Sequence, residues 1–154
     1  MKNSKVLPQF AIGEIEVSYK KKIETPFQKI TSSKDADSCI REIFPVTQIN
    51  YREHMYVLYL DNANKVLAYQ LLSVGGITAT LLDIRILIQG ALLTNSVALI
   101  LFHNHPSGKL KPSNADIELT KKVSSSLGLL DLKLLDHLII TETSYYSFAD
   151  QGMI

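Results

Sequence analysis

The stretch SVALILFHNHPSGKLKPSNADIELTKK, residues 96–122, decides the fold because it predicts a strand, a loop and a helix in direct succession. Residues 96–102 form a short apolar run of the length of a buried strand. The loop at 103–112 contains two prolines and a glycine, so we expect it to continue neither a strand nor a helix. A helix should begin near Ser113 and end at Gly128.

The segments on either side extend this unit into a mixed sheet. Residues 53–61 are rich in aromatic and β-branched residues and, apart from the first two, apolar on both faces, which predicts a central strand. Residues 66–74 predict the returning strand of a hairpin. Residues 84–93 are apolar nearly all round and predict a helix packed inside the domain. Residues 132–152 predict two or three further strands with a turn near 141–144.

The N-terminal part supplies another helix. Residues 31–44 have apolar positions three and four apart, with Ser32 or Ser33 as the cap and Pro45 as the stop. Residues 11–20 alternate well enough for a strand, and residues 1–11 predict a flexible lead-in. The fold class is therefore α/β, with a mixed β-sheet flanked by about three helices in one domain over 12–154.

Composition narrows the function classes. The net charge of +1 gives no global electrostatic reason to expect nucleic-acid binding. For the basic cluster Lys20–Lys22 we prefer a role in protecting a strand edge to a role in contacting phosphate. Cys39 is the only cysteine, so no intramolecular disulfide forms, and we expect a buried, inert thiol. Without a secretory signal or a long apolar segment, we expect a cytoplasmic protein with no membrane association.

Three residues of the central stretch are candidate metal ligands. His103 and His105 lie two residues apart, so in extended chain both side chains point to the same side. The proline-containing loop allows Asp116 to fold back toward them, which would give zinc three ligands and an open position. The competing interpretation is that Ser113 and Asp116 merely form a capping box for the helix.

Two further residues complete a hydrolytic set. Glu53 is the acid at the start of an apolar strand and is the candidate proton carrier, although such an acid is most often only a strand-end charge. Ser113 offers a hydroxyl that could donate to an oxyanion.

The combination of Glu53, H-x-H-P at 103–106, Ser113 and Asp116 resembles the JAMM metalloproteases, also called JAB or MPN, with the family's spacings kept. HNHPSGKLKPSNADIELTKK, LLDHLII and YYSF are more narrowly similar to the bacterial RadC branch. The resemblance implies a cytidine-deaminase-like fold, Zn²⁺ held by His103, His105 and Asp116, Glu53 as general acid/base and Ser113 as oxyanion helper. It also implies hydrolysis of an amide or isopeptide bond in a peptide or protein substrate.

Other functions remain open at this point. RadC proteins are often labelled DNA repair proteins and usually carry a helix-hairpin-helix region, which these 154 residues do not contain, so DNA binding stays uncertain. A non-catalytic module that binds DNA or protein is one alternative. Hydrolytic deamination is a weaker alternative because zinc deaminases use cysteine ligands.

The insertions that bind ubiquitin in eukaryotic relatives are not visible in this sequence, and the stretch after Gly76 differs from that of the RadC branch. Substrate preference and oligomeric state are therefore not predicted.

Three remaining residues have less specific interpretations. We expect His54 to be a core or surface histidine that points away from Glu53, and His137 to be a structural hydrogen-bonding histidine at the head of a strand. For Arg85 we consider a carboxylate pair that organises the cleft.

Overall fold

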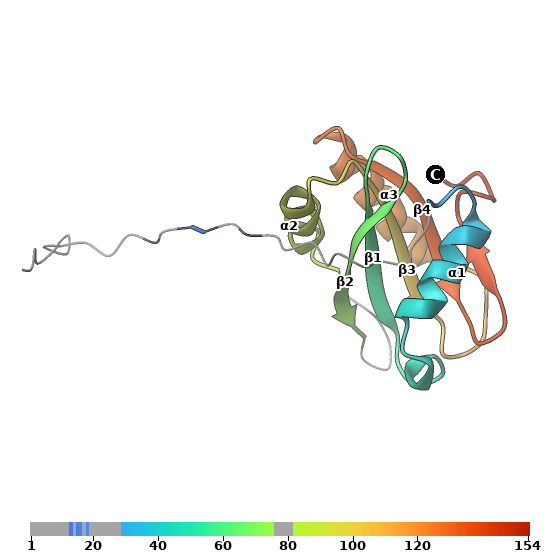
Figure 1. Ribbon diagram of the computed structural model, residues 1–154. Helices are drawn as coiled ribbons and strands as arrows, with labels where there is room; N and C mark the ends of the chain where they lie inside the picture. The colour runs from blue at the N-terminus through green and yellow to red at the C-terminus, as the bar shows by residue number, and fades with distance from the viewer. Residues whose placement is uncertain (1–12, 14, 17, 19–28, 76–81) are drawn as a thin grey trace, which may run out of the picture.

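The structure is a computed structural model that describes residues 13, 15, 16, 18, 29–75 and 82–154 (Figure 1). The predicted lead-in at 1–11, most of the predicted strand at 11–20, the Lys20–Lys22 cluster and the stretch at 76–81 lie outside the described residues.

The described residues form one five-stranded sheet with helices on both sides. The strands are β1 (His54–Leu60), β2 (Val66–Val74), β3 (Ala98–Asn104), β4 (Lys133–Ile140) and β5 (Tyr145–Ser147), in the order β2-β1-β3-β4-β5. The helices are α1 (Ser33–Ile43), α2 (Ile84–Thr94) and α3 (Asn114–Gly128), with a short 3-10 turn at Val46–Gln48. The predicted α/β class with a mixed sheet and about three helices is confirmed.

The pairing of the strands is mixed. β1 is antiparallel to both β2 and β3, β3 is parallel to β4, and β4 is antiparallel to β5. The parallel pair requires a crossover, which α3 provides. All residues of β1 and β3 are buried, because each strand has a neighbour on both sides and helices cover both faces.

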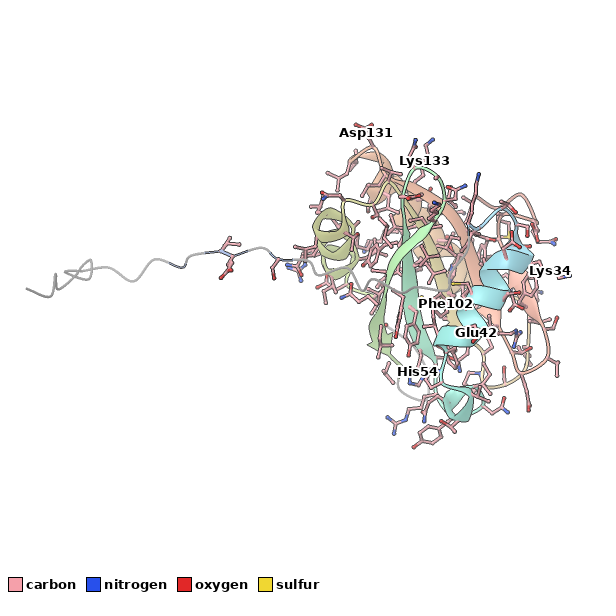
Figure 2. All side chains as sticks on the ribbon, in the orientation of Figure 1. Lys34, Glu42, His54, Phe102, Asp131 and Lys133 are labelled. Atoms are coloured by element: carbon pink, nitrogen blue, oxygen red, sulfur yellow. The ribbon has the colours of Figure 1, made fainter. Side chains whose placement is uncertain are left out.

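The core lies in two layers, one on each face of the sheet. Figure 1 shows α1 in front of the strands and α3 behind them. The α1 layer includes Ile40 together with Phe102, which is labelled in Figure 2. The other layer includes Leu87 of α2 and Leu127 of α3. Both layers are apolar, so each contributes hydrophobic stabilisation.

Two sequence predictions about boundaries and burial were wrong. Helix α2 is not packed inside the domain: only Leu87 and Ala91 are buried, while Leu92 is 60% exposed. The reason is that α2 contacts the sheet along a single stripe. Strand β3 also continues two residues into the predicted loop, because His103 pairs with Met55 on one side and Asn104 with Ile140 on the other.

The remaining helix and strand predictions over residues 29–154 are confirmed. The hairpin β1–β2, the cap of α1 by Ser32 and the cap of α3 by Ser113 are all present. The predicted turn at 141–144 is closed by the Thr141 N–H, which donates to the Ser144 carbonyl at 2.9 Å.

Candidate metal centre

The end of β3 and the start of α3 bring three predicted ligands together. The Nε2 atoms of His103 and His105 lie 3.0 Å apart. Asp116 places Oδ1 3.3 Å from Nε2 of His103 and Oδ2 3.5 Å from Nε2 of His105. Both histidines are buried and Asp116 is half-buried. The structure therefore gathers two imidazoles and one carboxylate around a single point.

Asp116 also belongs to a capping box. Its interpretation as a candidate metal ligand and its interpretation as a helix-capping residue are therefore compatible. Its Oδ2 accepts hydrogen bonds from the Ser113 N–H at 2.7 Å and from the Ser113 hydroxyl at 2.7 Å. The Asp116 N–H in turn donates to Oγ of Ser113 at 3.1 Å. Burial alone would raise the pKa of Asp116, but the histidine and serine contacts outweigh it and hold that pKa far below its usual range. The carboxylate is therefore ionised while it caps the helix.

The second nitrogen of His105 fixes which nitrogen carries its proton. Nδ1 lies 2.6 Å from the carbonyl oxygen of Lys109. A carbonyl only accepts, so Nδ1 must carry the hydrogen, and in the neutral ring Nε2 presents a lone pair toward Asp116 and His103. This lone pair is what a metal ligand needs.

His103 has a different partner. Its Nδ1 lies 2.9 Å from Nε2 of His137 on β4. His137 is fully buried, and this burial lowers its pKa well below the usual value. Nδ1 of His137 lies 2.7 Å from the Thr120 hydroxyl. The prediction of a structural hydrogen-bonding histidine is confirmed, although His137 lies within β4 and not at its head.

The donor set fits zinc. Two imidazole nitrogens and a carboxylate oxygen are ligands that zinc takes in three-ligand sites. Burial alone would lower the pKa of His105, but contacts with Asp116 and the Lys109 carbonyl outweigh it and raise that pKa. These contacts therefore favour the charged form of the His105 ring.

The three residues open onto a cleft of about 500 Å³. Glu53, one residue before β1, and Ser113 also line this cleft, so it contains all five predicted site residues. Lys109, Lys111 and Lys122 line it as well. Among the described residues these three lysines form no ion pair, so the lining carries three ammonium groups beside the carboxylates of Glu53 and Asp116.

Asn104, the residue between the two histidines, has a role that the sequence did not reveal. Its amide nitrogen donates to the carbonyls of Ile49 at 2.8 Å and Arg52 at 2.7 Å, and its oxygen accepts the His54 N–H at 2.8 Å. These bonds fasten the segment that carries Glu53 to the end of β3. The only feature of the sequence that could have indicated this role is the presence of a polar residue at the end of an apolar strand.

Two other predictions concern residues near the cleft. His54 is a core histidine, as predicted, because its ring packs against Phe44 and Tyr56. Arg85 forms its carboxylate pair with Asp83 at 2.7 Å, but its side chain is 90% exposed. Arg85 is not among the described residues that line the cleft, so its predicted organising role was wrong.

Cys39 lies on α1, away from the cleft. The thiol is buried, and this burial with the nearby charge of Glu42 raises its pKa to about 11. The predicted inert thiol agrees with these properties.

Among the described helices, none is long and apolar enough to cross a bilayer.

Comparison with known proteins places this geometry in context. A family model described as RadC-like JAB domain matches residues 30–153. A UPF0758 protein of Flavobacterium johnsoniae is 48% identical over 126 residues, which cover 82% of this chain and 54% of the relative. UPF0758 proteins of Porphyromonas gingivalis and Methanosarcina mazei are 40% and 35% identical over 80% and 86% of this chain, and the matches cover 55% and 56% of those relatives. The chain thus spans about half the length of the curated relatives it matches.

Proposed function

The chain belongs to the RadC-like JAB domain family, and from this premise we propose that it is a zinc-dependent hydrolase that cleaves an amide or isopeptide bond in a peptide or protein. The observation that carries the proposal is the convergence of two Nε2 atoms and a carboxylate in an open cleft. The cytoplasm is the proposed location, which the lone buried Cys39 suits because it needs no oxidising compartment.

His103, His105 and Asp116 would hold the zinc ion. When bound, zinc supplies a Lewis acid that activates water near neutral pH and polarises a carbonyl. The residues themselves supply the orientation: the Lys109 carbonyl holds the ring of His105, and Ser113 holds the carboxylate of Asp116.

Glu53 is the proposed general acid/base. Its position on the cleft wall lets its carboxylate take a proton from the attacking water and return it to the leaving amine. The Asn104 bonds to the preceding segment hold the Glu53 backbone in place.

Ser113 is the proposed oxyanion donor. In the structure its hydroxyl donates to Asp116, while its backbone N–H makes a second bond to the same oxygen. The N–H bond would keep Asp116 in place when the hydroxyl rotates toward a tetrahedral oxyanion.

A second candidate is a non-catalytic module of the RadC type that binds DNA or an acidic protein. The observation that favours it is the presence of Lys109, Lys111 and Lys122 in the lining of the cleft. A steep loss of DNA binding with added salt would support this candidate. Deamination has no comparable support, because Cys39 lies in the core layer on the α1 face of the sheet.

The test of the proposed function measures new amino groups released from a peptide panel by zinc-loaded protein. Glu53→Gln should retain zinc and lose hydrolysis by about 100-fold or more, since the amide side chain cannot accept the proton. Equal rates for the two proteins, or no release by the wild type from any peptide, would contradict the proposal.

A further inference from the structure

We propose that Thr120 and His137 form a relay of hydrogen bonds that fixes the proton position and ring orientation of His103, so that its Nε2 stays available to the metal. Both would be positioning residues. The inference rests on the proposed zinc site. It starts from the observation that the relay connects one predicted ligand to the backbone of another.

The direction of the relay is set at Thr120. Its hydroxyl lies 2.6 Å from the carbonyl oxygen of Asp116, one helical turn earlier in α3. A carbonyl only accepts, so the single hydroxyl hydrogen is used in this bond. Oγ1 of Thr120 can then only accept from Nδ1 of His137, at 2.7 Å. Nδ1 of His137 therefore carries a hydrogen.

The next bond transfers this constraint to His103. His137 is completely buried and its ring stacks on Phe148, with centroids 4.8 Å apart and planes 13° apart. A neutral ring with a hydrogen on Nδ1 presents a lone pair on Nε2. That lone pair accepts from Nδ1 of His103 at 2.9 Å, which leaves Nε2 of His103 bare and facing Asp116.

The sheet explains why these residues meet. In the parallel pair, Leu101 lies opposite His137, so His103 is the diagonal neighbour of His137 on the same face. Thr120 follows Asp116 by four residues on α3, which places both on one side of the helix. Both ring nitrogens of the buried His137 thus find partners, and these partners are the ligand side chain of His103 and the helix turn that carries Asp116.

The first experiment observes the relay directly. Long-range ¹H–¹⁵N spectra of the imidazole rings are recorded at pH 8 on metal-free wild-type protein. We expect hydrogens on Nδ1 of both His103 and His137, with Nε2 of His103 unprotonated. A missing hydrogen on Nδ1 of His103 or of His137 would overturn the inference, whether or not the protein binds zinc.

The second experiment measures zinc affinity by competition with a chromophoric chelator. Thr120→Val should weaken binding by about tenfold and His137→Leu by about 10- to 100-fold, the range typical of lost outer hydrogen-bond partners. Thr120→Ser keeps the hydroxyl and should restore the wild-type value. The matched control is Thr94→Val, because Thr94 makes the same bond to the carbonyl four residues earlier, in α2, at 2.8 Å.

The outcomes separate the inference from the proposed function. Absence of zinc binding by the wild type would refute the zinc site, while the ring spectra still decide the relay. If the wild type binds zinc and Thr120→Val has the same zinc affinity as Thr94→Val, the relay is refuted and the zinc site stands. If His137→Leu does not fold, as judged by thermal melting, the Thr120 pair and the ring spectra decide whether the relay exists.

Discussion

The two faces of strand β3 differ only at the end of the strand. Along most of its length both faces are apolar: Ile100 and Phe102 pack in the α1 layer, and Leu99 and Leu101 in the layer of α2 and α3. At the end, Asn104 ties down the segment before β1, while His103 on the opposite face enters the candidate metal centre. The comparison indicates that apolar packing and the candidate metal ligand occupy separable parts of the same strand.

The largest expected effect is on stability alone. Ile40 of α1 is fully buried in the apolar layer, so Ile40→Ala should lower the free energy of unfolding by about 2–5 kcal/mol through lost burial and a cavity. Zinc affinity of the folded protein should stay within about twofold of wild type, since distant sites act independently. Urea unfolding and chelator competition measure the two quantities. Leu129→Ala, at a site 86% exposed, is the control.

For Asp116→Ala we expect a large loss of zinc affinity and a small loss of stability. Loss of one of three proposed ligands should weaken zinc binding at least about 100-fold, beyond most outer-partner losses. Stability should fall by only about 1 kcal/mol, the usual contribution of a helix cap. Glu118→Ala, on the exposed side of the same helix, is the control. Equal zinc affinity in Asp116→Ala and Glu118→Ala would remove Asp116 from the proposed ligand set.

The sequence predicted the parts of this comparison that depend on local patterns. Alternation along extended chain put His103 and His105 on one side, and the capping pattern put Asp116 in the first turn of α3. The partners His137 and Thr120 were beyond local patterns, because they meet His103 only through the parallel register of β3 with β4. The exposure of Leu92 was missed for a related reason: an apolar sequence does not say how much of a helix the sheet covers.

A smaller effect is expected on the other face of the strand end. Asn104→Ala leaves the carbonyls of Ile49 and Arg52 without their amide donor, which should cost about 1–3 kcal/mol of stability. Because Glu53 follows this segment, the rate of hydrolysis should fall about tenfold or more while zinc binding is kept. Asn50→Ala is the control, since Asn50 lies in the same segment but bonds to exposed Glu142. A parallel loss of zinc in Asn104→Ala would mean that the two faces are not separable.

The smallest effect concerns Cys39, in the apolar layer. Its pKa of about 11 leaves only about one per cent thiolate at pH 9, so alkylation by iodoacetamide should be slow and rise about tenfold per pH unit. Glu42→Gln removes the neighbouring negative charge and should raise this rate by about twofold at most, because an exposed charge on the same helix contributes little. Zinc should not change the rate, since the thiol lies in the core layer opposite the metal centre. Slower alkylation of Cys39 in the presence of zinc would contradict this expectation. It would show that the metal centre affects the core layer on the opposite face of the sheet.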